Sequence, residues 1–225
     1  MSGQTAVVIG STGMIGDLVV KQLIGDPAFT RVRLLVRRPI LYHESKVEVK
    51  LVNFNDPADL DQNFGEGDSI FCCVGTTQSK VKGDKNAYRK VDFDIPLNTA
   101  KMGLKHGFRK FLLISAVGAN PDSGNFYLKL KGETEDALKK LNYPALHIFQ
   151  PSLLLGERNE SRITEKIAQV LMPAVSFMLN GKLNKYKPIK GTDVAKAMLN
   201  AAKSDRRGIN IYTYKEIEAL AGEGF

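Results

Sequence analysis

The stretch Thr5-Ala-Val-Val-Ile-Gly10-Ser-Thr-Gly13-Met-Ile-Gly16 places three evenly spaced glycines directly after a short apolar run. The run predicts a buried β-strand, and the residues that follow predict an amphipathic helix. Gly10 permits a tight strand-to-helix turn, Gly13 lets backbone amides approach a pyrophosphate, and Gly16 allows close packing of helix on strand. The free N–H groups that begin a helix favour phosphates.

This turn is typical of dinucleotide binding, although an ordinary turn that uses glycine only for its geometry is the alternative. The predicted cofactor contacts in the turn are Gly10, Ser11, Thr12, Gly13, Met14, Ile15 and Gly16.

The rest of the chain continues the alternation of strand and helix. Strands are predicted over residues 5–9, 32–36, 47–52, 69–74, 110–115, 145–149 and 209–212. Helices are predicted over residues 14–24, 57–62, 91–106, 127–141 and 193–202. Nearly continuous apolar strands that alternate with helices predict a doubly wound parallel sheet, an α/β fold of the Rossmann type. We expect about seven strands with helices on both faces, in a single domain over residues 1–225.

The alternation breaks after Gln150, where a longer excursion begins. In open α/β sheets, insertions after the later strands commonly cover the crevice at the carboxyl ends of the strands. Residues 151–190 are therefore predicted to form a small substrate-side excursion, a candidate substrate lid. Within it, the apolar residues 163–179 are interrupted by Pro173, which favours a packed helix over a membrane span.

Two arginines follow the second predicted strand, in Val36-Arg37-Arg38-Pro39. About twenty residues past such a turn, NAD enzymes carry an Asp or Glu that binds the ribose hydroxyls. Guanidinium groups instead pair with a 2′-phosphate, which a carboxylate would repel. Arg37 and Arg38 thus predict NADP (NADPH) as the cofactor in preference to NAD, and two solvent-exposed cations are the alternative.

A serine, a tyrosine and a lysine form the candidate catalytic group. Ser115 ends the fifth predicted strand, and Tyr127 and Lys131 share one face of the next helix because they stand four residues apart. A nearby ammonium favours the ionised form of a phenol, which suits Tyr127 to proton transfer when hydride moves to or from a neighbouring carbon. Ser115 would hydrogen-bond the same oxygen, and Lys131 would also hold the nicotinamide ribose. The alternative is an exposed tyrosine beside an exposed lysine on a surface helix, with no catalytic role.

The order of these motifs resembles the short-chain dehydrogenases/reductases. The stretch Ser115-Ala-Val-Gly-Ala-Asn-Pro-Asp-Ser-Gly-Asn-Phe-Tyr127-Leu-Lys-Leu-Lys131-Gly-Glu is similar to the atypical, Tat-interacting-protein-like group, an NAD(P)-binding group. Further similar stretches are Phe71-Cys-Cys-Val-Gly-Thr-Thr, Val91-Asp92, Gln150-Pro151-Ser152 and Asp193-Val-Ala-Lys-Ala-Met.

The resemblance implies the remaining cofactor contacts. Asn53 and Phe54 would bracket the adenine, and Pro151 and Ser152 would lie against the nicotinamide amide. Val74, Gly75 and Thr76 form a turn of small residues that would pass beneath the cofactor, where glycine has a steric reason. Asp92 stands where many extended members of the superfamily have asparagine, so a water relay through an asparagine amide is in doubt.

Composition and charge argue against several other functions and locations for this protein. The net charge is +8, with a pI of about 9.4, but the basic residues are dispersed and no nucleic-acid-binding motif accompanies them. The two cysteines, Cys72 and Cys73, are adjacent, which disfavours a disulfide between them and fits a reducing compartment. No secretory signal, membrane helix or metal-ligand spacing is recognised. We expect a cytoplasmic protein without a metal, monomeric or a small homo-oligomer.

The sequence therefore predicts an NADP-dependent oxidoreductase for a small carbonyl or alcohol substrate. One alternative is an NADP-binding regulatory or redox-sensor protein with weak or no turnover, read by a protein partner. Another is an enzyme like the nucleotide-sugar epimerases and dehydratases, although the excursion after Gln150 is short for a nucleotide-sugar pocket.

Overall fold

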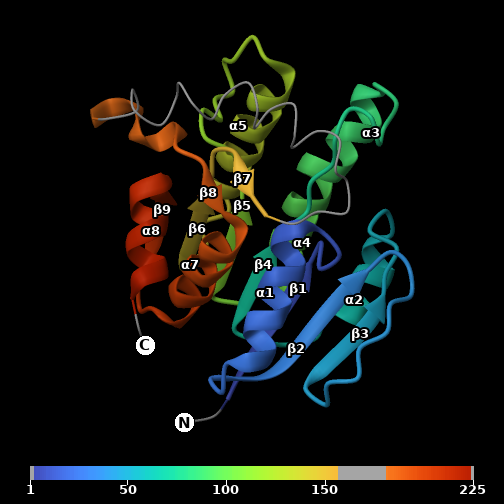
Figure 1. The fold of residues 1–225 in the computed structure, drawn as a ribbon. Coiled ribbons are helices and arrows are strands. Elements are labelled where there is room, and N and C mark those ends of the chain that lie inside the picture. The colour runs from blue at the N-terminus through green and yellow to red at the C-terminus, as the bar shows by residue number, and fades with distance from the viewer. Residues whose placement is uncertain (1–2, 157–180, 224–225) are drawn as a thin grey trace.

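The computed structural model describes residues 3–156 and 181–223. In this part of the chain, seven parallel strands form one sheet in the order β3-β2-β1-β4-β5-β6-β9 (Figure 1). They are β1 (Gln4–Ile9), β2 (Phe29–Val36), β3 (Val47–Leu51), β4 (Ser69–Cys72), β5 (Lys110–Ile114), β6 (Ala145–Phe149) and β9 (Gly208–Tyr212). The predicted Rossmann-type α/β fold is confirmed. Strand order reverses between β1 and β4, and such a reversal opens a crevice at the carboxyl ends of the strands.

Helices cover both faces of the sheet (Figure 1). One face carries α1 (Met14–Gly25), α7 (Gly191–Lys203) and α8 (Tyr214–Gly222), and the other carries α2 (Pro57–Phe64), α4 (Ile95–Lys105) and α5 (Phe126–Lys139). Side chains of β1 alternate between the two layers: Ala6 and Val8 pack with the first, and Val7 and Ile9 with the second. All four are 0% exposed, which explains why this strand has no polar alternation.

The helix predicted over 91–106 begins earlier than the sequence analysis placed it. It runs as α3 (Lys85–Arg89), a π-helical turn η1 (Lys90–Asp94) and then α4. The Asp84 side chain accepts the N–H groups of Asn86 and Ala87, a cap that satisfies donors with no partner inside the helix. The predicted start was wrong because this aspartate was not recognised as a cap.

The π-helical turn has a local cause and a tertiary partner. Pro96 has no N–H group, so it cannot donate to the carbonyl oxygen of Asp92 four residues before it. The Thr134 hydroxyl of α5 lies 3.0 Å from that oxygen and 2.8 Å from the carbonyl oxygen of Leu130, so its one proton is shared between the two. The N–H of Ile95 bonds to the carbonyl of Lys90. Irregular turns of this kind often lie at functional sites, and this one places Asp92 inside the protein.

The C-terminal region adds elements that the sequence analysis missed. Helix α8 begins with a capping box, in which Thr213 and Glu216 bond each other's backbone N–H groups. The excursion after β6 contains the short strands β7 (Leu154–Leu155) and β8 (Ile189–Lys190), which pair in parallel, and the 3₁₀ helix η2 (Gly181–Tyr186). The helix predicted over 163–179 lies outside the described residues.

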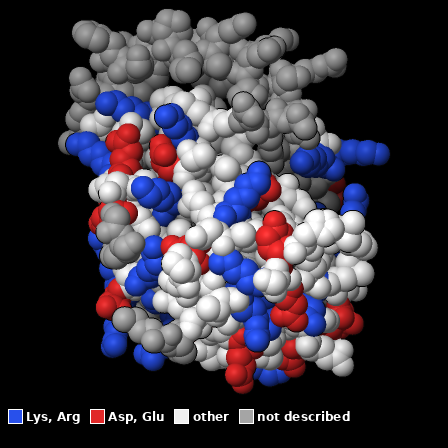
Figure 2. All heavy atoms as spheres, turned by 60° about the horizontal axis from the view of Figure 1, so that its bottom comes forward, with Lys and Arg blue, Asp and Glu red and all other residues white. Residues whose placement is uncertain are grey.

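Charged side chains of both signs mix on the surface. Figure 2 shows Lys and Arg among Asp and Glu on one face of the molecule. Local pairs such as Lys105 with Asp61 and Arg89 with Glu133 contribute to this mixing. Within residues 3–156 and 181–223, no helix combines the length and apolar character that a membrane crossing requires.

Candidate active site

A cavity of about 570 Å³ lies at the carboxyl ends of β1, β4 and β5. It brings together the glycine turn, the turn after β4 and the Ser-Tyr-Lys group, which are far apart in the sequence. The predicted site residues that line it are Gly13, Met14, Ile15, Val74, Gly75, Thr76, Ser115, Tyr127, Lys131, Pro151 and Ser152. Leu153, Leu154 and Tyr186, from the two described ends of the predicted lid, line it as well.

The glycine turn has the geometry that its spacing predicts. Gly10 has φ of 80°, and a Cβ there would lie 2.7 Å from the backbone of Cys73. A Cβ on Gly16 would collide with the carbonyl of Gly10, so this glycine sets the closeness of α1 to the turn. Gly13 begins α1 without a side-chain cap. Met14 and Ile15 follow without a capping side chain and line the cavity, an arrangement that fits a phosphate group.

Four residues of the predicted turn lie outside the cavity lining. Gly10 and Gly16 shape the turn from behind, and Thr12 is exposed to solvent. Ser11 is 2% exposed, and its hydroxyl has no hydrogen-bond partner among the described residues.

A second cavity, of about 690 Å³, lies beyond the end of β3. Arg37, Asn53 and Phe54 line it, together with Val91 and Ile95 from the helix opposite. Asp59 and Lys90 line the cavity as well. Its apolar side chains suit an adenine, and its cations Arg37 and Lys90 suit a nearby phosphate. The cavity brings together three of the four residues predicted for the adenosine end. Arg38 is exposed and lines neither cavity.

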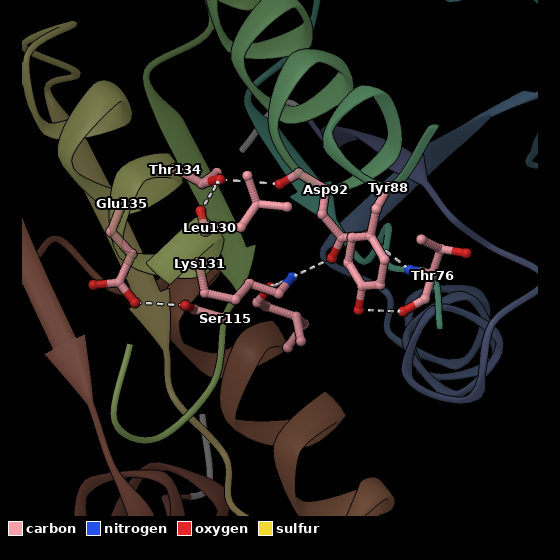
Figure 3. A network of polar contacts seen from close by, with 9 residues as sticks. Thr76, Tyr88, Asp92, Ser115, Leu130, Lys131, Thr134 and Glu135 are labelled. Carbon is pink, nitrogen blue, oxygen red and sulfur yellow. Dashed lines mark hydrogen bonds and ion pairs between the residues drawn. The ribbon is translucent and has the colours of Figure 1, made fainter. Parts of the chain in front are cut away.

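Lys131 is buried beside a carboxylate that the sequence analysis assigned no role. Its Nζ lies 3.0 Å from Oδ1 of Asp92, and the two residues are 4% and 1% exposed (Figure 3). Burial lowers the pKa of Lys131, but the charges of Asp92 and Tyr127 outweigh it and leave this pKa above its ordinary value of 10.5. Asp92 also accepts the N–H of Thr76 at 2.9 Å. The aspartate thus joins the turn after β4 to the lysine of α5.

Tyr127 lines the cavity from the first turn of α5. The Asn125 side chain caps this helix by accepting the N–H groups of Tyr127 and Leu128. The tyrosine is 37% exposed, and its ring centre lies 5.9 Å from Nζ of Lys131. Its phenol is therefore open to a ligand, while the partnering ammonium stays inside.

Ser115 also has a carboxylate partner, which the sequence analysis missed. Its hydroxyl donates to Oε1 of Glu135 at 2.5 Å (Figure 3). The Gln150 amide donates to both oxygens of the same carboxylate, at 2.9 and 3.1 Å. Glu135 stands four residues after Lys131, so helical spacing alone places it one turn further along the same face of α5. That spacing is the sequence signal that could have identified Glu135.

Burial shifts the pKa values of both cysteines and of His147. Cys72 is 0% exposed, and burial raises the pKa of its thiol to about 12, which makes the reactive thiolate scarce at neutral pH. Burial likewise raises the pKa of Cys73. His147 is buried between strands, and burial lowers its pKa to about 4. Among the described residues, no group of three His, Cys, Asp or Glu gathers where it could hold a metal ion.

Comparison with known proteins identifies the family. Residues 10–205 match a family described as NAD(P)H-binding. The chain belongs to this family. Protein HTATIP2 of Rattus norvegicus is 32% identical over 172 residues, which are 75% of this chain and 70% of that protein. Protein FMP52-1, mitochondrial, of Scheffersomyces stipitis is 30% identical over 225 residues, 96% of this chain and 98% of that protein. The resemblance to the atypical short-chain dehydrogenases/reductases is confirmed.

Solved structures share the fold of this NAD(P)H-binding protein. A UDP-N-acetylglucosamine 4-epimerase from Methanobrevibacter ruminantium M1 superimposes with a TM-score of 0.69 at 18% identity, over 95% of this chain and 77% of that one. The Bordetella bronchiseptica enzyme WbmH, solved with NAD+, gives 0.70 at 15% identity, over 93% and 75%. At these identities the likeness shows the fold alone.

Proposed function

We propose that the chain is an NADP-dependent oxidoreductase that transfers hydride between NADPH and a small carbonyl or alcohol substrate. The observation that carries the proposal is the shared cavity. Ser115, Tyr127 and Lys131 line the same space as the uncapped start of α1 at Gly13 and Met14. The residues proposed for proton transfer and the turn that suits a dinucleotide therefore border one cavity, in which the reacting carbon of a substrate would lie.

Each side chain has a role that follows from its surroundings. The bound cofactor supplies the hydride or accepts it. Tyr127, open to the cavity, gives the substrate oxygen its proton or takes it away. Lys131, kept charged by Asp92, stabilises the phenolate form of Tyr127 and is placed to hold the nicotinamide ribose. Ser115 contacts the same substrate oxygen.

The preference for NADP over NAD rests on Arg37. Its guanidinium borders the cavity that also contains Asn53 and Phe54, where the adenosine end of a dinucleotide fits. The 2′-phosphate is what distinguishes NADP from NAD at that end, and arginine binds phosphate through two parallel N–H bonds.

Residues 151–190 are proposed to help choose the substrate. Both described ends of this segment contribute to the cavity, through Pro151, Ser152, Leu153, Leu154 and Tyr186. Hydrogen exchange with and without NADPH tests the assignment. Protection gained at residues 151–156 and 183–190 supports it, whereas protection confined to the glycine turn contradicts it.

One observation favours a regulatory protein with little or no turnover as the second candidate. Ser115 and Lys131 are each already engaged by a carboxylate in the protein alone. The decisive experiment follows NADPH absorbance with a panel of aldehydes and quinones. The proposed enzyme oxidises NADPH faster with at least one of them. A protein that binds NADPH but accelerates no member of the panel is the regulatory one.

A further inference from the structure

A third cavity lies beside the one assigned to the adenosine end, and the Ser-Tyr-Lys group takes no part in its lining. It measures about 380 Å³ and is lined by α2 and by the helical segment that η1 and α4 form together. Leu60 of α2 and Ile95 and Met102 of α4 supply its apolar floor. Leu60 and Ile95 are 2% and 8% exposed, so this floor is part of the packed protein. We call the cavity the α2–α4 groove.

The groove is long and narrow. Its lining on η1 and α4 extends from Lys90 to Lys105, which is about 20 Å of helix. Spread over that length, the volume corresponds to a mean cross-section of about 20 Å². A helix is about 10 Å or more in diameter, so the groove suits a single extended chain better than a partner helix.

The two ends of the groove differ. At one end, Lys105 of α4 pairs with Asp61 of α2 at 2.5 Å and links the two helices. At the other end, Phe54 and Ile95 line both the groove and the cavity assigned to the adenosine end. A ligand in the groove would therefore lie next to a bound dinucleotide without occupying its place.

The rim of the groove is basic. Lys90, Lys101 and Lys105 line it, against a single carboxylate, Asp94. Asp61 already engages Lys105, whereas Lys101 forms no ion pair with the residues that the structure describes. Lys101 also stands two helical turns after Asp94. An anionic group beside Lys101 would thus meet an ammonium and stay away from the carboxylate.

We propose that the α2–α4 groove binds a small amphipathic carboxylate. Its unbranched apolar chain lies along Leu60, Ile95 and Met102, and its carboxylate lies beside Lys101. Burial of the chain drives binding, because apolar surface leaves water, and the ammonium favours an anion over a neutral head group. The site is separate from the nicotinamide end, so the proposal does not depend on the oxidoreductase function.

Methyl NMR of the full-length protein locates the ligand. The probe is decanoate, titrated into protein that carries ¹³C-labelled methionine methyl groups. Met102 lines the groove, Met14 lines the cavity of the Ser-Tyr-Lys group, and Met198 is 0% exposed in the core. Decanoate should shift the Met102 resonance and leave those of Met14 and Met198 unchanged. The same shift should appear when NADPH saturates the protein.

Opposite charges at one position test the choice of a carboxylate. Asn98 is exposed and lines the groove three residues before Lys101. Because an exposed ion pair contributes little, Asn98→Lys should tighten decanoate binding by about two- to fivefold, and Asn98→Glu should weaken it by a similar factor.

The lysine is tested with a matched control. Lys101→Gln should also weaken decanoate binding by about two- to fivefold. Lys196→Gln removes an exposed lysine from α7, on the opposite face of the sheet, and should leave the affinity unchanged. Decanol has the same chain without the charge, so it should bind more weakly than decanoate and respond to none of these substitutions.

Each part of the proposal has a result that overturns it. A shift at Met14 in place of Met102, or displacement of decanoate by NADPH, would mean that the ligand lies in one of the dinucleotide cavities. Equal effects of Asn98→Lys and Asn98→Glu, or equal affinities for decanol and decanoate, would mean that the groove does not recognise the carboxylate. An unchanged Met102 resonance throughout the titration would mean that the groove does not bind this class of ligand.

Discussion

The nicotinamide end and the adenosine end of the candidate site are built on different principles. At the first, Lys131 and Asp92 are buried and paired with each other inside the protein. At the second, an exposed arginine, Arg37, borders a cavity that apolar side chains line together with Asp59 and Lys90. A buried charge is costly without a partner, whereas an exposed one is solvated by water. The charge pairing of the first end therefore depends on residues far apart in the sequence, whereas the arginine of the second end belongs to a local motif after β2.

The largest effect is expected at the nicotinamide end, on the rate of carbonyl reduction when Tyr127 loses its hydroxyl. Tyr127→Phe keeps the ring but removes the hydroxyl, so NADPH binding should survive while carbonyl reduction falls by about 10²–10⁴-fold. Steady-state kinetics with the best substrate of the panel measures the loss.

The control for this variant is Tyr214→Phe, which removes a hydroxyl that bonds Glu218 on the surface and should leave the rate unchanged. Full activity in Tyr127→Phe would show that the reaction does not need this phenol, and the assignment of Tyr127 as the proton donor would be wrong.

The next largest effect is a loss of stability when the buried pair of Lys131 and Asp92 is broken. Asp92→Asn leaves the ammonium of Lys131 buried without its counter-charge, and breaking such a pair typically costs about 3–5 kcal/mol of unfolding free energy. Chemical denaturation measures it. Asp94→Asn, two residues along on η1 and only partly buried, is the control and should cost far less.

The stability of the unmodified protein and of Asp92→Asn should change with pH in opposite directions, because both changes depend on the pKa of Lys131. In the unmodified protein the pKa of Lys131 is raised above 10.5, so the pair's contribution is fully present below pH 10.5 and is lost as pH rises through the raised value. In Asp92→Asn, burial lowers this pKa with less to oppose it. The unfolded state then binds more protons, and the variant should regain stability as pH rises towards 10.5. A loss that is the same at every pH would mean that Lys131 does not carry it.

The same contrast explains how much the sequence could predict. The sheet, the glycine turn and the Ser115, Tyr127 and Lys131 positions follow from local spacing, because strand periodicity and helical i to i+4 spacing act within a few residues. The roles of Asp92 and Glu135 did not follow, because each depends on what lies across the fold. Asp92 lies in a π-helical turn and bonds through its carbonyl to Thr134 of α5, a tertiary arrangement that local sequence patterns do not predict.

The smallest effect is expected at the exposed end, and it separates two neighbouring arginines that the sequence could not rank. Arg37 borders the adenosine cavity and Arg38 does not, so only the first is placed to pair with a 2′-phosphate. Losing a hydrogen bond to a charged group typically costs about 1.5–3 kcal/mol, or one to two orders of magnitude in affinity. Arg37→Ala should therefore weaken NADPH binding by about 10- to 100-fold while leaving NADH affinity unchanged, since NADH lacks that phosphate. Arg38→Ala is the matched variant and should change either affinity by less. Fluorescence titrations with both cofactors measure all four affinities.

Because the pairing is exposed, added salt should shrink the Arg37 effect on NADPH affinity, whereas the Asp92 effect on stability at the buried end should be screened much less. Equal affinities for NADPH and NADH in the unmodified protein, or an equal loss at both arginines, would contradict the assignment of the adenosine end to NADP.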